Sequence, residues 1–192
     1  MKAPVLARWL VPLLIACSGS VDAANAPVAG SERVFVEAVL ARLDESELAL
    51  VGRQDMDQII QSNSPHLIST LGGLAESGTP LFFHPGAQAK APAADSAGVD
   101  VALSQLVVTP TITGSGEVRL DLKLKVCAAG NEHSFTKVDR FSASQLRVWD
   151  TALKTRSGES IVLLVQPTIV QSQKDLEQIL LRRAASTAPA NP

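Results

Sequence analysis

The sequence predicts a mainly β (α+β) fold, in which antiparallel β-hairpins form the body and short helices and a C-terminal helix complete it. The clearest observation is the run 117–126 (EVRLDLKLKV), where five apolar residues alternate with five charged ones. Alternation with a period of two is typical of a strand with one buried and one exposed face. The β-branched run 106–113 precedes it, and Gly114-Ser115-Gly116 between them favours a tight hairpin turn.

A second hairpin follows the same pattern. Residues 146–156 (LRVWDTALKTR) lead through Ser157-Gly158-Glu159 into residues 160–165 (SIVLLV). The last five residues of that run are all apolar, which indicates a strand buried on both faces. The alternating run 117–126 is also long enough for a strand that crosses a membrane. The lack of an aromatic girdle beside it favours packing against a second sheet instead.

Three further segments are assigned as strand or left open. Residues 99–103 (VDVAL) alternate briefly and are expected to continue into the 106–113 strand through a bulge. Pro110 cannot donate a hydrogen bond to a ladder, so its strand is predicted at an edge or at a bulged position. Residues 33–43 (RVFVEAVLARL) fit either a strand or a helical apolar stripe, and periodicity alone does not decide between them.

The helical predictions are shorter. Residues 46–51 and 56–62 are expected to form short helical turns, and residues 85–98, rich in Ala, Pro and Gly, an exposed loop. A C-terminal helix is predicted over 171–185, because Ser172 and Asp175 have the spacing of a capping box. Residues 186–192 (STAPANP) are expected to be a disordered tail.

Composition excludes several functional classes. The chain has 192 residues, which suggests one main domain, and a net charge of −2 from 17 basic and 19 acidic residues. Without a basic excess, nucleic-acid binding is not expected. Aromatic residues make up 4% of the chain and Tyr is absent, which argues against base-stacking platforms and aromatic carbohydrate clefts.

The N-terminus is typical of an export signal. Lys2 and Arg8 provide positive charge, residues 9–17 (WLVPLLIAC) are an apolar core, and small residues follow. Two processing routes fit. Residues 1–26 form an ordinary signal peptide, or Leu14-Ile15-Ala16-Cys17 acts as a lipobox, residues 1–16 are removed and Cys17 is lipidated. Either route predicts an exported protein of the periplasm or outer membrane, and no other segment is long enough for a helical membrane span.

No constellation of residues points to catalysis. His66, His84 and His133 lie far apart in sequence and have no metal-ligand spacing. Nucleophile-elbow, zinc-protease and nucleotide-binding motifs are missing. We therefore predict no catalytic, cofactor-binding or metal-binding residues, no cofactor, no small-molecule substrate and no enzyme activity. Only a cleft that joins one of these histidines to carboxylates would revive an enzyme hypothesis. Cys127, at the end of the alternating strand, is predicted to be a buried, inert thiol.

Residues 97–126 (AGVDVALSQLVVTPTITGSGEVRLDLKLKV) resemble the secretin homology domain of bacterial type II and type III secretion and type IV pilus outer-membrane channels. The positions that carry this resemblance are Gly98, Val107 or Val108, Pro110, Ile112, Gly116, Val118, Leu120 and Leu122. The flanks agree: Gly158 and Glu159 match a family hairpin at 157–163, and residues 64–80 resemble the opening of the domain. Residues 33–43 are similar to its first strand, which favours a strand there.

The resemblance implies a secretin-like β-domain over residues 33–170. It implies a component or accessory of a secretion or pilus outer-membrane apparatus that acts by subunit assembly. The partners would be further copies or secretion and pilus envelope proteins, with association to the outer membrane. The sequence departs from the family at Leu164-Val165, where small residues are usual, and it lacks the family's N-terminal domains and proline-rich ending. A full channel from this chain alone is therefore not expected. The alternative is a periplasmic or lipid-anchored binding module that keeps the core without forming a channel.

Overall fold

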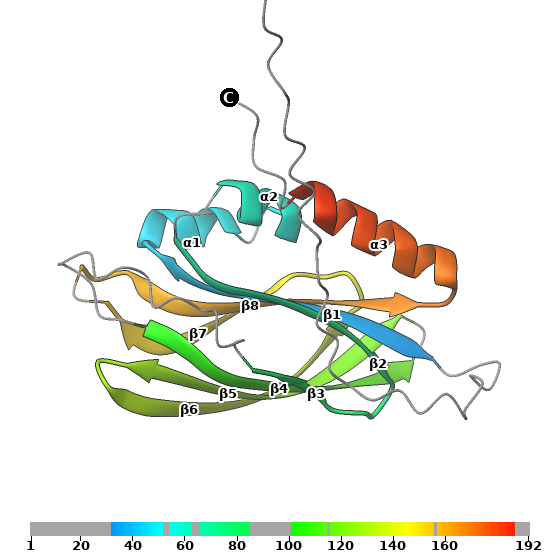
Figure 1. The fold of residues 1–192 in the computed structure, drawn as a ribbon, viewed down its shortest axis with the longest axis horizontal. Coiled ribbons are helices and arrows are strands. Elements are labelled where there is room, and N and C mark those ends of the chain that lie inside the picture. Colours follow the sequence, from blue (N-terminus) through cyan, green and yellow to red (C-terminus); the bar gives the residue numbers. More distant parts are fainter. Residues whose placement is uncertain are drawn as a thin grey trace, which may run out of the picture. The chain divides into compact units, whose positions relative to one another are not determined.

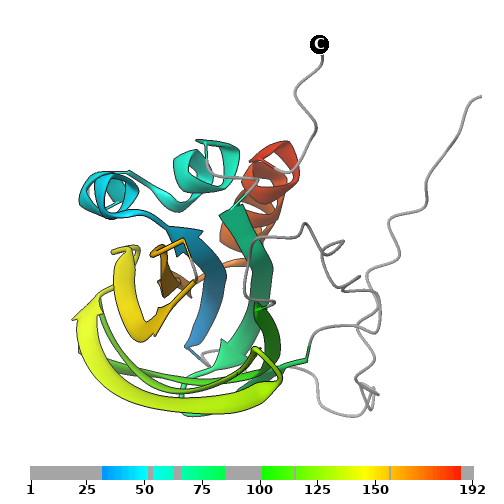
Figure 2. The same ribbon diagram turned by 90° about the vertical axis from the view of Figure 1, so that its left-hand side faces the viewer.

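Two antiparallel β-sheets, each of four strands, lie face to face in the computed structural model, and helices cover the outer side of one of them (Figures 1 and 2). The structure describes residues 32–51, 54–62, 66–84, 101–114, 116–155 and 157–186. The predicted mainly β fold is confirmed. The signal segment, Cys17, Gly98, the loop 85–98 and residues 187–192 lie outside the described residues.

Sheet A has the strand order β2-β1-β8-β7 and sheet B the order β3-β4-β5-β6. The strands of sheet A are β2 (Leu67–Glu76), β1 (Arg33–Leu43), β8 (Ser160–Val170) and β7 (Arg147–Lys154). The strands of sheet B are β3 (Leu81–Phe83), β4 (Val101–Gly114), β5 (Glu117–Ala128) and β6 (Asn131–Ser142). The helices are α1 (Glu45–Val51), α2 (Met56–Ser62) and α3 (Gln173–Ser186). None of the described helices is long and apolar enough to cross a membrane.

Both predicted hairpins are confirmed. β4 pairs with β5 in an antiparallel ladder, with a register shift between Leu103 and Gln105 where the bulge was expected. Gly116 in the connecting turn has a φ of 84°, a left-handed value that glycine tolerates. β7 pairs with β8 in the same sense, and Gly158 in that turn has a φ of 93°. The ambiguous segment 33–43 is strand β1. The predicted capping box is confirmed at the start of α3, where the Asp175 amide donates to Ser172 Oγ at 3.2 Å.

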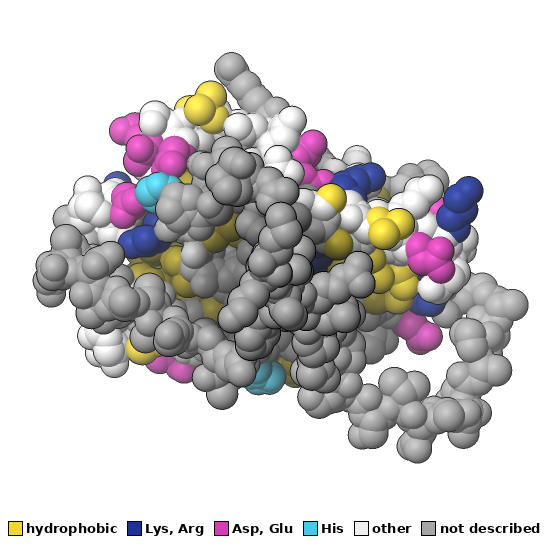
Figure 3. Space-filling view, turned by 45° about the horizontal axis from the view of Figure 1, so that its top comes forward, with side chains coloured by type: hydrophobic (Ala, Val, Ile, Leu, Met, Phe, Trp, Pro, Cys, Tyr) yellow, Lys and Arg dark blue, Asp and Glu magenta, His cyan; other side chains and the backbone are white. Residues whose placement is uncertain are grey.

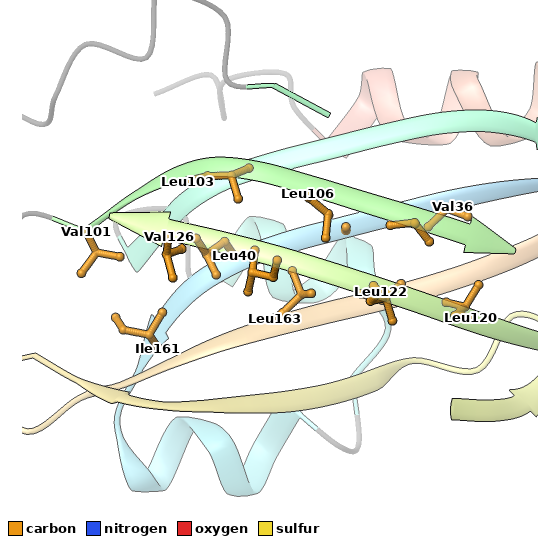
Figure 4. Close-up of a cluster of buried hydrophobic side chains, with 14 of the residues drawn as sticks. Val36, Leu40, Val101, Leu103, Leu106, Leu120, Leu122, Val126, Ile161 and Leu163 are labelled. Atoms are coloured by element: carbon orange, nitrogen blue, oxygen red, sulfur yellow. The ribbon is translucent and has the colours of Figure 1, made fainter. Parts of the chain in front are cut away.

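The alternation in β5 arises because its apolar face packs against sheet A. Val118 and Leu120 are fully buried between the sheets, together with alternate residues of β1, β4 and β8. Figure 4 shows Leu163 of β8 beside Leu40 of β1 in this core, with Leu122 and then Leu120 following along β5. Apolar side chains buried here provide most of the favourable free energy of folding.

β1 and β8 are buried on both faces because a second core lies beneath α1 and α2. Val39 of β1 and Leu164 of β8 face this side and contact Val51 of α1 and Ile59 of α2. The all-apolar run of β8 is therefore explained by two apolar environments, as predicted. Leu164 and Val165, which depart from the family pattern, are both fully buried, one in each core.

Three strands were not anticipated, and one residue was placed wrongly. β2, β3 and β6 have no clean alternation in sequence. Cys127 was predicted to be buried but is only half-buried, since the buried positions of β5 are Val126 and Ala128 on either side of it. The alternation therefore turns its thiol to the outer face of sheet B, with Lys123 and Lys125.

Candidate functional site

The sheet edges are the features that invite interaction. Every strand of each sheet is antiparallel to its neighbour, so β3 and β6, the two edges of sheet B, run in opposite directions. The same holds for β2 and β7 in sheet A. An edge strand has a row of backbone N–H and C=O groups that can pair with another strand.

The edges of sheet B differ in length. β6 pairs with β5 over the whole span from Asn131 to Ser142, and no described strand lies on its other side. β3 pairs with β4 only from Leu106 to Val108, which leaves most of that side of β4 without a strand partner among the described residues. One edge of sheet B is thus the long strand β6. At the other edge, the short strand β3 covers only part of the long strand β4.

Two prolines lie in strands just beyond the point where the neighbouring edge strand stops pairing: Pro110 in β4, beside β3, and Pro167 in β8, beside β7. The Gly78 amide donates to the carbonyl oxygen of Pro110 at 2.6 Å, and the Ser144 amide to that of Pro167 at 2.6 Å. In a strand the N–H and C=O of one residue point to the same side. Each proline nitrogen therefore faces the side from which a turn reaches its carbonyl, and no ladder bond is lost. β4 is an interior strand, so the prediction that the strand of Pro110 lies at a sheet edge or is bulged at that residue is wrong. Pro110 is tolerated there because it lies beyond the residues of β4 that pair with β3.

Each edge of sheet B also has one exposed apolar side chain on the same face. Phe82 of β3 is 61% exposed and Val138 of β6 is 54% exposed. Phe82 lies opposite Val107 and Val138 opposite Asp121, positions that turn away from the core, so both side chains are on the outer face of the sheet. Apolar pairs across antiparallel strands stabilise a sheet.

The sandwich is open between β6 and β7. A cavity of about 550 Å³ lies there, with Phe135 and Trp149 among its walls. At one end the strands approach, where the rings of Phe141 and Trp149 meet edge to face at 6.3 Å between centroids. The guanidinium of Arg147 lies 5.2 Å from the Phe141 centroid, a cation–π contact.

Each of the four edges has a feature that discourages uncontrolled pairing. β3 is short. On β6, Lys137 and Asp139 lie opposite the buried Leu122 and Leu120, so charged residues occupy the inward face of that edge. β7 has a bulge after Asp150, where Ala152 has a φ of 59°. β2 has a register shift near its start, where Leu40 of β1 pairs with Ser69 and Ala41 with Leu67, so that Ile68 is an extra residue on the edge strand. Short edges, inward charges and bulges are known ways to block edges.

A half-buried carboxylate lies beneath α3. Glu37 of β1 is half-buried on the outer face of sheet A, opposite Gly72 of β2. Burial raises the pKa of Glu37, while Arg183 of α3 acts against this rise; Asp57 of α2 adds to it. A cavity of about 270 Å³ adjoins Glu37 and separates part of α3 from the sheet.

Glu159, singled out from the resemblance, organises the β7–β8 turn. Its carboxylate accepts hydrogen bonds from Ser157 Oγ at 2.8 Å and Thr155 Oγ1 at 3.2 Å. The hydrogen bond from Ser157 is the main reason that the pKa of Glu159 is lowered. Its other oxygen lies 3.4 Å from Nδ1 of His66.

The fold brings one of the three histidines, His66, next to carboxylates. His66 lies between Glu159 and Glu47, the latter 4.0 Å from its Nε2. Neither described cavity has a histidine in its wall. Within the described residues, no group of three or more His, Cys, Asp or Glu side chains could hold a metal ion.

The residues named from sequence lie in the core, in turns and in strand β4 where they are described. Val118 and Leu120 belong to the core, Gly116 and Gly158 to turns, Pro110 to the part of β4 beyond its pairing with β3, and Glu159 to a hydrogen-bonded turn. Sequence reasoning missed Phe82, Val138 and Gly72, since their importance depends on neighbours from other elements.

Comparison with known proteins gives structural likeness only. No family model matches the sequence. No curated protein matches it either. Among solved structures, the chain is similar to ExeD of Aeromonas hydrophila, at 10% identity and a TM-score of 0.45, over 84% of this chain and 56% of that one. It is also similar to the type II secretion secretin XcpQ of Pseudomonas aeruginosa, at 12% and 0.46, over 83% and 64%. The Salmonella type III secretion injectisome secretin InvG is similar at 6% identity and a TM-score of 0.33, over 83% of this chain and 64% of that one.

The chain thus spans between 56% and 64% of the length of these three chains. At these levels of identity and TM-score, the likeness assigns neither a family nor a function.

Proposed function

We propose that this chain is an exported, secretin-like component or accessory of a bacterial type II/III secretion or pilus envelope apparatus, which acts by assembly through its sheet edges and not by catalysis. The proposal joins two independent lines. One is the order of residues from Gly98 to Leu122 and at Gly158-Glu159, which resembles the secretin homology domain. The other is the geometry of the edges.

One observation carries the proposal: sheet B begins and ends on strands of opposite direction, with an exposed apolar side chain on the same face of each. A copy rotated about an axis along the strands would place its β3 antiparallel to β6 of the first. Phe82 of that copy would then come beside Val138. Such a head-to-tail contact repeats from copy to copy and closes into a ring if the rotation allows.

The native mass of the protein extracted from the envelope in detergent tests this. We expect a multiple of the chain mass for the wild type and a shift toward monomer for Val138→Lys, since a charge at that position opposes edge pairing. Leu181→Lys is the matched control, because Leu181 is 70% exposed on α3, which lies on sheet A and away from the two edges of sheet B. A wild-type protein that runs only as a monomer, and never co-purifies with envelope complexes, contradicts assembly.

A second candidate is favoured by Lys137 and Asp139 on the inward face of β6, which protect that edge. It is the periplasmic or lipid-anchored binding module that keeps the secretin-like core without forming a channel. Palmitate labelling that disappears in Cys17→Ala, with a monomeric mass after removal of the lipid, supports this candidate.

A further inference from the structure

The edge strand β2 contains two adjacent glycines, and each admits a side chain from another element. A Cβ atom at Gly72 would overlap the guanidinium of Arg183 from α3. A Cβ at Gly73, on the opposite face, would lie 3.2 Å from the ring of Phe83 from β3. β2 is therefore contacted on one face by a helix and on the other by a strand, both at glycine.

Glycine pairs weaken a strand, because glycine loses the most backbone entropy on ordering and adds no side chain to pack. β2 is also an edge, and among the described strands it pairs with β1 alone. Its order at Gly72 and Gly73 must then depend strongly on the two side chains that pack over them.

α3, which supplies Arg183, is held more loosely than the other two helices. None of its residues with a described side chain is buried, and Leu176, Ile179 and Arg183 are among those half-buried. α1 and α2 instead contribute Val51 and Ile59 to a buried core. The cavity next to Glu37 further reduces the contact of α3 with sheet A. Elements with little buried apolar area open locally at low free-energy cost.

Arg183 connects α3 to the edge strand β2, whereas its neighbour Arg182 points to α2. Arg183 is half-buried over Gly72, beside Glu37, which lies opposite Gly72 in the ladder. Arg182 is 69% exposed and forms a 3.9 Å ion pair with Asp57 of α2. Basic and acidic side chains lie next to each other on this helix-bearing side of the protein (Figure 3).

We propose that α3 is a latch on the edge strand β2: Arg183, seated at Gly72, keeps β2 ordered, and undocking of α3 lets the strand fray. Arg183 acts here as a positioning residue. The latch does not depend on the proposed function, because the pairing proposed there joins β3 and β6 of sheet B, whereas β2 is an edge of sheet A.

Amide hydrogen exchange of the full chain tests the latch. In Arg183→Ala we expect exchange across β2 and α3 to be about fivefold faster than in the wild type, with β5 unchanged. In Arg182→Ala, the matched control, exchange across β2 should remain within about twofold of the wild type. Equal exchange across β2 in the two variants overturns the proposal.

Gly72→Ala gives a second route that leaves Arg183 in the chain. Its methyl group would displace the guanidinium, so amide exchange across α3 should be faster, as in Arg183→Ala. In the double variant, exchange across α3 should be little faster than in Arg183→Ala alone. Fully additive effects contradict the latch. Native mass keeps the two proposals apart: a monomeric wild type with the exchange difference refutes assembly alone, and an assembled wild type without that difference refutes the latch alone.

Discussion

Replacing Leu120 by Ala tests whether the apolar face of β5 forms the inter-sheet core. Leu120 is fully buried between the sheets. Losing the buried carbons of a Leu, together with the cavity left behind, costs about 3 kcal/mol. For a chain of this length, that lowers the midpoint of thermal unfolding by about 6–12 °C.

The control lies next to it on the other face. Arg119 is 47% exposed and pairs with Asp121 at 2.9 Å, an exposed ion pair worth at most about 1 kcal/mol. Thermal unfolding of both variants, followed by circular dichroism, gives the comparison. If Leu120→Ala unfolds within a degree or two of Arg119→Ala, the apolar face of β5 is not packed as described.

Three further predictions concern titration and capping. Burial raises the pKa of Glu37, so its ionised form destabilises the fold, and this effect grows as pH rises above 4.5. The melting temperature of Glu37→Gln should therefore rise relative to that of the wild type between pH 4 and pH 7.5. If the difference does not change with pH, the burial of Glu37 is contradicted. Because the pKa of Glu159 is lowered, its ionised carboxylate stabilises the fold above pH 4.5, and this stabilisation is lost as pH falls. The loss of melting temperature in Glu159→Gln should be largest near neutral pH and shrink in acid. A loss that is the same at every pH would refute the ionic contribution. Ser172→Ala removes the cap of α3 and should cost about 1 kcal/mol of helix stability, seen as faster amide exchange confined to α3.

The hairpins could be predicted from sequence because three of their four strands, β4, β5 and β8, lie inside the sheets, and the fourth, the edge strand β7, is joined to β8 by a recognisable turn. β5 has one face in the core and one in solvent, and that environment requires the alternation of Val118, Leu120 and their neighbours. The double burial of β8 could be predicted in the same way. For β1, burial on both faces hides the period, and the assignment needed the resemblance to a family.

The missed strands are edges, and their sequences meet other demands. β6 places Lys137 and Asp139 on its inward face, because the open side of the sandwich does not exclude them from water. β2 has Gly72 and Gly73 where side chains from α3 and β3 approach. The candidate site could not be predicted either, since edges and the latch depend on which distant segments become neighbours, and a linear pattern does not record this.

Disulfide cross-linking between the two edges of sheet B tests the central claim most directly. In a Cys127→Ser background, Phe82→Cys and Val138→Cys are combined, and each alone serves as control. Within one chain the two positions are separated by two intervening strands, about 14 Å across the sheet, too far for a disulfide. Oxidation of the protein in its native envelope should give a ladder of dimers, trimers and higher species for the double variant only. A double variant that stays monomeric after oxidation would contradict assembly through these edges.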